Sequence, residues 1–177
     1  MTAGAPYDDF AEAYTAENET SLMNAHYERP ATLELAGDVA GRRILDAGCG
    51  SGPLPYLEDW KPALAELRRV LKTGGRLIAS VNHPFMVNLT HRQAGPRPGY
   101  FERYTWTDEF DLHGRTARMT FWNRPLHAMT DAFTAAGFRI SVIGEPHPTA
   151  EARELFPDDF ALLDTFPSFL FFVLEAG

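Results

Sequence analysis

Arg43-Ile-Leu-Asp-Ala-Gly-Cys-Gly-Ser-Gly52 is the stretch that decides which fold we expect for this chain. Its first half, Arg43 to Ala47, is apolar and β-rich and predicts a short buried strand. Its second half places glycines at alternate positions, and because glycine has no Cβ and accepts positive φ, such a turn lets the backbone approach a ligand closely. A tight strand-to-helix connection without a ligand also uses glycines, so the spacing alone leaves both interpretations open.

Two other side chains of this stretch bear on function. Asp46 lies near the end of the predicted apolar strand, where a carboxylate is costly unless it is paired, and a ligand ammonium group would be a suitable partner. Cys49 is the only cysteine, which excludes an internal disulfide and fits a reducing cytoplasm. It is either a nucleophile or, because no basic residue adjoins it in sequence, a small buried residue of the turn.

The composition indicates one globular domain. A length of 177 residues, with 45% apolar and 23% charged residues, is normal for a single core. The net charge of -8 argues against a nucleic-acid surface or an anionic membrane surface, so we expect a small-molecule partner. We see no signal peptide and no apolar run long enough to span a bilayer, which predicts a cytoplasmic protein.

Helix and strand patterns alternate on both sides of the glycine turn. Leu22 to Ala36 has helical spacing, and residues 1–37 are predicted to form an N-terminal helical lid before an α/β core over 38–177. Pro53-Leu-Pro55 leaves room for little helix after the turn. A helix follows Asp59, and Arg76 to Asn82 reads as a strand covered on both faces. Strand, turn, helix and strand make one βαβ unit, which predicts a right-handed parallel crossover.

The second half of the chain predicts a hairpin and further elements of the core. Thr90 to Tyr100 is rich in glycine and proline and reads as a loop. A β-hairpin is expected at about 99–122. A helix over Leu126 to Ala136, a third central strand over Phe138 to Gly144, a short helix near Ala150 to Leu155 and a last strand over Ser168 to Glu175 follow. The hairpin aromatics either wall a substrate pocket or pack against the sheet; they are Tyr104, Trp106, Phe110, Phe121 and Trp122.

Several of these motifs occur in an order that resembles class I S-adenosylmethionine-dependent methyltransferases, in a bacterial small-molecule branch. Ile44-Leu-Asp-Ala-Gly-Cys-Gly-Ser-Gly52 is similar to the first motif of the family. Ala63-Leu-Ala-Glu-Leu-Arg-Arg-Val-Leu-Lys-Thr-Gly-Gly-Arg-Leu77 is similar to its later helix and strand. The other matching pieces are Tyr7-Asp-x-x-Ala11-x-x-Tyr14, His83-Pro-Phe85, Asn123-Arg-Pro-Leu126, Ala136-Gly-Phe138 and Glu145-Pro146.

The resemblance implies a Rossmann-like fold with a mainly parallel central sheet, flanking helices and a β-hairpin insertion. It implies S-adenosylmethionine as the cofactor, held by Gly48, Cys49, Gly50, Ser51 and Gly52, with Asp46 at the ammonium group and Tyr14 as a lid residue. A base is needed only for a poorly nucleophilic substrate. His83 and His127 are the candidates, and each could instead be a hydrogen-bonded structural histidine. No His, Cys and carboxylate cluster has metal-ligand spacing.

The chain departs from the family after the glycine turn, where a block on the order of 60 residues, two βαβ crossovers, is missing. Half the cofactor cleft, including the acidic residue for the ribose, should be absent with it. The strand Arg43 to Ala47 would then be an edge, or pair with the strand at Arg76, and its exposed edge invites a homodimer. Three functions remain: a small-molecule methyltransferase completed in some unusual way, a catalytically inactive remnant or binding module, and, third, a nicotinamide-dependent oxidoreductase.

Overall fold

The computed structural model describes residues 18–47, 54–94, 98–112 and 115–177. Its helical elements and strands follow one another in this order: η1 (Asn24–Glu28), α2 (Arg29–Ala36), η2 (Leu54–Tyr56), α3 (Lys61–Val70), β1 (Arg76–Asn82), α4 (Pro84–Ala94), β2 (Tyr104–Leu112), β3 (Arg115–Asn123), α5 (Leu126–Ala135), β4 (Phe138–Gly144), α6 (Ala152–Leu155), α7 (Pro157–Leu163) and β5 (Phe169–Ala176). Of the described helices, not one is long and apolar enough to cross a membrane.

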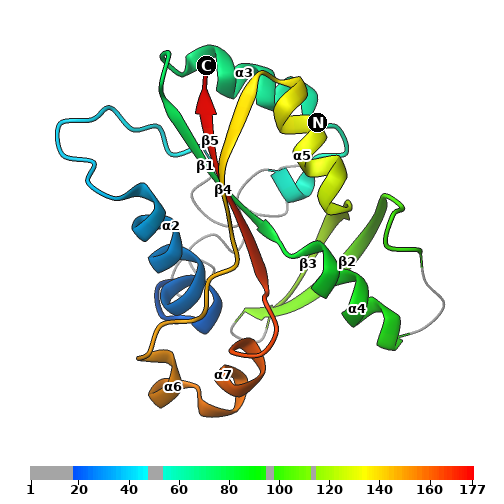
Figure 1. Ribbon diagram of the computed structural model, residues 1–177. Helices are drawn as coiled ribbons and strands as arrows, with labels where there is room; N and C mark the ends of the chain where they lie inside the picture. Colours follow the sequence, from blue (N-terminus) through cyan, green and yellow to red (C-terminus); the bar gives the residue numbers. More distant parts are fainter. Residues whose placement is uncertain (1–17, 48–53, 95–97, 113–114) are drawn as a thin grey trace, which may run out of the picture.

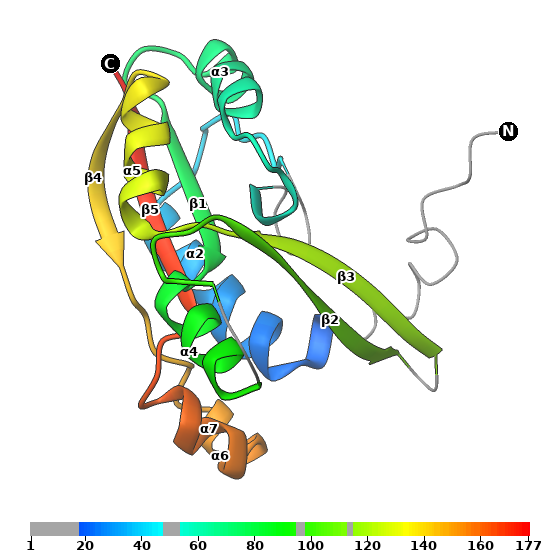
Figure 2. The ribbon, with the colours of Figure 1, turned by 90° about the vertical axis from the view of Figure 1, so that its right-hand side faces the viewer.

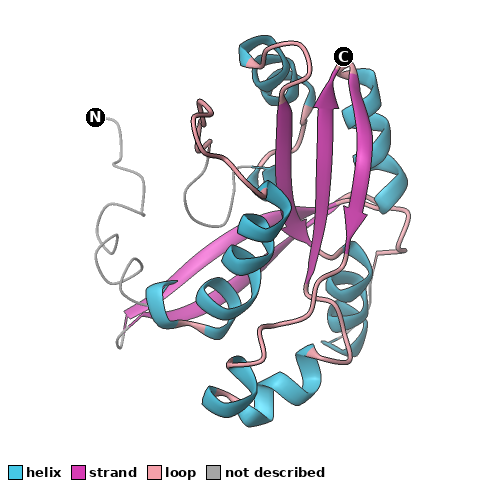
Figure 3. Ribbon diagram, turned by 60° about the vertical axis from the view of Figure 1, so that its left-hand side comes forward, coloured by secondary structure: helices cyan, strands magenta, loops and turns pink. Residues whose placement is uncertain are grey.

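The central sheet has the strand order β1-β5-β4. β5 pairs antiparallel with both neighbours, so β1 and β4 run in the same direction and end at the same edge of the sheet. Figure 3 shows these three strands side by side. In the described residues both pairings are therefore antiparallel, and the mainly parallel sheet expected from the sequence is not found there. Phe138–Gly144, expected as a central strand, lies at the sheet edge, because β5 inserts between it and β1.

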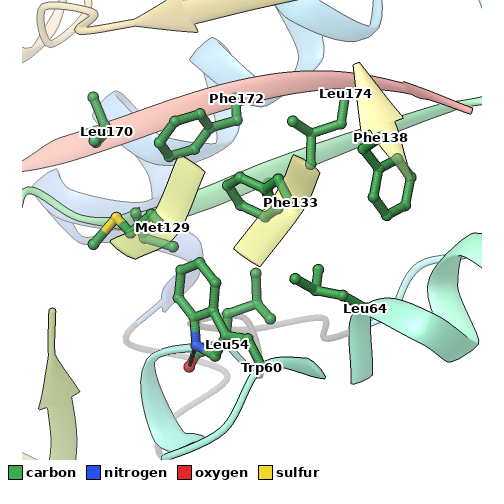
Figure 4. Packing of buried hydrophobic residues seen from close by; sticks show 11 residues of the cluster. Leu54, Trp60, Leu64, Met129, Phe133, Phe138, Leu170, Phe172 and Leu174 are labelled. Atoms are coloured by element: carbon green, nitrogen blue, oxygen red, sulfur yellow. Dashed lines mark hydrogen bonds between the residues drawn. The ribbon is translucent and has the colours of Figure 1, made fainter. Parts of the chain in front are cut away.

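Helices α3 and α5 cover one face of the sheet, and α2 lies on the other (Figure 1). The α3/α5 side holds the main core, in which Trp60, Phe133 and Phe172 are fully buried and their rings are in contact (Figure 4). The Trp60 indole N–H donates to the Leu54 carbonyl at 2.7 Å, which ties η2 to the start of α3. β5 is buried over Leu170 to Leu174, as expected for a strand covered on both faces.

The segment Arg43 to Ala47 is not a strand. It belongs to an irregular connection that leaves α2 and swings away from the sheet (Figure 1), with Ile44 69% and Leu45 66% exposed. The predicted parallel pairing of this segment with Arg76–Asn82 is therefore wrong. Its apolar residues have no neighbouring strand or helix to cover them among the described residues, and strand propensity without such cover is weak.

The hairpin, α5, α6, β4 and β5 form near their predicted positions, whereas α7 was not predicted. β2 and β3 pair antiparallel from Tyr104 opposite Asn123 to Leu112 opposite Arg115, and the hairpin projects from the body in Figure 2. The helix predicted over Leu22 to Ala36 is continuous, with a π-helical first part, η1. One loop prediction was partly wrong, because α4 extends from Pro84 to Ala94 into the stretch expected to be irregular.

Candidate functional site

Of the residues predicted to bind the cofactor, the structure describes only Asp46. Tyr14 and Gly48 to Gly52, Cys49 included, lie outside the described residues. Asp46 is described, but it sits in the exposed connection rather than at the end of a strand. An exposed carboxylate bears no burial cost, so the argument that Asp46 needs a ligand ammonium as partner does not apply to it. The described residues thus do not assemble the cleft expected for S-adenosylmethionine.

His83 lies at the edge of the sheet where β1 and β4 both end. Its backbone N–H continues the sheet by donating to the Ser168 carbonyl at 2.8 Å, and its carbonyl accepts from Val87 in the first turn of α4. Its Nε2 lies 2.8 Å from Oε1 of Glu145, which follows β4 directly. The His83 side chain is 12% exposed and that of Glu145 is 58% exposed. The pair therefore joins the ends of two strands 62 residues apart in sequence.

The hydrogen bond to Glu145 determines the proton position on the His83 ring. A carboxylate only accepts, so Nε2 must carry the hydrogen, and in a neutral ring the lone pair then lies on Nδ1. Nδ1 is enclosed and has no hydrogen-bond partner within the part of the chain that the structure describes. His83 is thus an imidazole fixed through Nε2, with a buried Nδ1 that has no partner among the described residues. The hydrogen bond to Glu145 is what the interpretation as a structural histidine expects, and the interpretation as a base stays a prediction.

Tyr27 of η1 reaches the same edge of the sheet from the other side. Its hydroxyl oxygen accepts a hydrogen bond from the Ser168 N–H at 3.3 Å, and its ring packs edge-on against Phe169. Burial raises the pKa of the Tyr27 phenol, and the negative charge of Glu145 raises it further. The phenol therefore stays neutral beside the His83–Glu145 pair.

His127, the second base candidate, is not part of this group. It lies in the first turn of α5, is exposed, and has its ring 6.1 Å from that of the exposed Phe101. Among the described residues no hydrogen bond, ion pair or ring contact joins His127 to the His83–Glu145 pair.

A small open pocket lies next to the end of β1, lined by residues of β1, α4, α5, η2 and the hairpin. Its lining comprises Pro55, Trp60, Val81, Asn82, Val87, Trp106, Trp122, Asn123 and Met129. These include the chain's three tryptophans. With the side chains as they stand, the pocket has room for about one water molecule. We call this the tryptophan pocket.

The hairpin aromatics lie in different surroundings, and their role in a substrate pocket stays a prediction. Trp106 and Trp122 line the tryptophan pocket. Phe121 is buried and packs between the rings of Tyr56 and Trp106, with centroids 5.0 and 4.6 Å away. The Tyr104 hydroxyl accepts a bond from the Asn88 amide at 3.5 Å, and burial raises the pKa of this phenol. The side chain of Phe110 lies outside the described residues.

Arg124 and Asn123 are buried polar residues that the sequence pointed to only as part of the motif Asn123-Arg-Pro-Leu126. Arg124 is 2% exposed, and its guanidinium lies over the Trp60 ring, 4.2 Å from the centroid. It donates to the Leu57 carbonyl and, at 3.2 Å, to the Glu58 carbonyl. Burial lowers its pKa to about 10, nearby Arg103 adds to the shift, and Asp59 opposes it. Arg124 thus fixes the segment before α3 against the base of the hairpin.

Comparisons with known proteins find a similar fold and no sequence family. No protein-family model matches the sequence, and no curated protein matches it. The fold is similar to a crystal structure from Listeria monocytogenes, of a protein classed as an S-adenosylmethionine-dependent methyltransferase, with a TM-score of 0.57 and 21% identity. That match covers 71% of this chain and 58% of the Listeria chain. A structure of an S-adenosylmethionine-dependent methyltransferase from Mesorhizobium loti matches with a TM-score of 0.48 and 18% identity over 70% and 58% of the two chains.

The Listeria structure confirms the expected fold class in its coarser form. The chain has a Rossmann-like α/β fold over the matched part, and it spans little more than half the length of the structure it matches. At 21% identity the similarity concerns the fold and leaves activity and ligands to other arguments.

Proposed function

We propose that the chain is an S-adenosylmethionine-dependent methyltransferase that acts on a small molecule. The observation that carries the proposal is the motif Ile44 to Gly52 in the sequence, and the fold match to the Listeria structure, which is described as a protein of that activity, supports it. The shorter length relative to that structure agrees with a missing block after Gly52. The methyl acceptor is a small molecule rather than nucleic acid, in keeping with the net charge of -8.

His83 is the proposed base, and Glu145 is a positioning residue for it. Glu145 holds Nε2 at 2.8 Å, which keeps the lone pair on the enclosed Nδ1. His127 is the alternative base; it is exposed and, among the described residues, forms no ion pair with a carboxylate.

A catalytically inactive remnant or binding module is the second candidate, and one observation favours it. The connection that carries Asp46 is exposed and leaves the sheet, so the described residues do not place the cofactor loop at a strand end. For the first candidate, a second chain is proposed to complete the site through the unpaired segment Arg43 to Ala47. The single cysteine supports a cytoplasmic location for either candidate.

Calorimetric titration of the folded chain with S-adenosylmethionine, and separately with NADH, separates these functions. The proposal expects heat and a thermal shift with S-adenosylmethionine alone, and loss of both in Asp46→Ala. Binding of NADH instead would support an oxidoreductase. A folded sample that binds neither would overturn both enzyme functions and leave the binding module.

Light scattering during the same titration tests completion by a partner. The proposal expects a mass of two chains when S-adenosylmethionine is bound. A mass of one chain with the cofactor bound would exclude a second copy from the site.

A further inference from the structure

The two buried asparagines of the described chain differ in one respect. Asn88 and Asn123 are both 4% exposed. The Asn88 amide nitrogen donates to the Pro98 carbonyl at 3.3 Å and to the Tyr104 hydroxyl at 3.5 Å. The Asn123 amide nitrogen has no hydrogen-bond partner, and Asn123 lines the tryptophan pocket. A buried donor without a partner lowers the stability of the fold. We therefore expect a ligand acceptor to enter the pocket and bond to the Asn123 amide.

The burial of the lining residues shows how the pocket is oriented. Trp60, Val81, Asn123 and Met129 are buried and form its floor, and Figure 4 shows Trp60 and Met129 within the core. Asn82, Val87, Trp106 and Trp122 are partly exposed and form its rim. The pocket as a whole has space for about one atom of water size, so only the acceptor atom of a ligand would enter it and the rest of the ligand would lie against the partly exposed rim.

The chemistry of the floor favours an acceptor over a donor. Asn123 presents an N–H, and the buried guanidinium of its sequence neighbour Arg124 lies over Trp60, a lining residue, 4.2 Å from the ring centroid. A ligand ammonium would meet this charge and an amide hydrogen, whereas a carbonyl oxygen would receive the hydrogen bond.

We propose that the tryptophan pocket binds a planar aromatic ring bearing a carbonyl or similar acceptor oxygen, with the oxygen at the Asn123 amide and the ring against the Trp106 and Trp122 rim. As a description of the methyl acceptor this rests on the proposed function. As a binding site it stands on the geometry of the pocket alone.

The test uses the full chain without S-adenosylmethionine and two probes: acetophenone, which is neutral and only accepts, and benzylammonium, which only donates. Because every tryptophan of the chain lines the pocket, the three indole N–H signals in a ¹H–¹⁵N NMR titration report on it directly. Acetophenone is expected to shift the Trp106 and Trp122 signals, with saturation in the millimolar range, and benzylammonium is expected to leave them unchanged.

Variants at the two asparagines test whether Asn123 is the residue that binds acetophenone. Asn123→Leu is expected to weaken acetophenone binding about tenfold, the worth of one hydrogen bond to a buried group. Asn88→Ala, the control, should retain wild-type affinity. Asn123→Asp should lose acetophenone and gain benzylammonium, which a merely misfolded variant would not do.

Equal binding of both probes, unchanged affinity in Asn123→Leu, or no shift with acetophenone would overturn the inference. Acetophenone binding in a chain that fails to bind S-adenosylmethionine would leave the inference standing and overturn the proposed function.

Discussion

Two apolar stretches of this chain, Arg43 to Ala47 and Arg76 to Asn82, have similar sequence character but different structures. Both are β-rich, and both were predicted to be strands of one unit. The second pairs along its whole length with β5 and buries Ala79 and Val81 in the main core. The first is exposed and irregular. The difference shows that strand propensity takes effect only where a paired strand and a covering helix are at hand.

The largest effect is expected where β1 and β5 meet. Phe172 is fully buried, pairs with Ala79 and packs against Phe133 with ring centroids 4.9 Å apart. Phe172→Ala should lower the free energy of unfolding by about 3–5 kcal/mol in urea denaturation, because it leaves a cavity in the core. Phe101→Ala, at a 77% exposed site, is the control and should change it by less than about 0.5 kcal/mol. Equal losses would contradict the location of the core.

The glycines before the two stretches provide a matched pair. Gly74 (φ 72°) precedes β1 and donates to the Ala176 carbonyl at 2.8 Å, and Gly41 (φ 70°) precedes Arg43. An added Cβ meets nothing within 4 Å at either site, so the cost is conformational. Gly74→Ala should lose about 1–2 kcal/mol because the turn is fixed to the sheet. Gly41→Ala should lose less than about 0.5 kcal/mol, since its connection can relax freely. Thermal unfolding that ranks Gly41→Ala as the costlier change would show that its connection is fixed in the fold.

A smaller and pH-dependent effect is expected at Tyr27, which packs against the start of β5. Tyr27→Phe leaves the Ser168 N–H without its acceptor and should cost about 1 kcal/mol at pH 8.

Because the pKa of this phenol is raised in the folded state, the unfolded chain loses its proton first as pH rises above the ordinary value of 10.0. The stabilisation is therefore complete below pH 10 and declines above it, so the gap between wild type and Tyr27→Phe should narrow. Denaturation curves from pH 8 to 11 test the sign, and a gap that widens would contradict it.

The smallest effect is expected in the exposed stretch itself. Ile44→Ser combined with Leu45→Ser should alter the free energy of unfolding by less than about 0.5 kcal/mol, because both side chains already contact water. Val81→Ser, in a strand of similar composition, is the comparison and should cost about 2 kcal/mol or more. A comparable loss for the Ile44 and Leu45 changes, dependent on protein concentration, would show that a second chain covers them.

Local signals predicted much of the fold correctly. β1, the hairpin, α5, β4 and β5 were found at nearly their observed bounds, because glycine stops, helical spacing and β-rich runs are read over a few residues. His83 was found for the same reason, since it follows a recognisable strand.

Its partner Glu145 was named only as part of a motif. The contact depends on β1 and β4 ending together on either side of β5, and the sequence predicted no such order. Trp60 and Asn123 enter the tryptophan pocket through the same kind of long-range packing.

The sequence by itself determined most of the helical and extended segments, many of the turns, and that a glycine-rich motif follows Asp46. Tertiary structure alone decided which extended segments become strands. β5 inserts between β1 and β4 and pairs with both, whereas Arg43 to Ala47 has no neighbour to pair with among the described residues. The physical reason is that a strand satisfies only part of its hydrogen bonds and buries little apolar surface alone, so its stability comes from its neighbours.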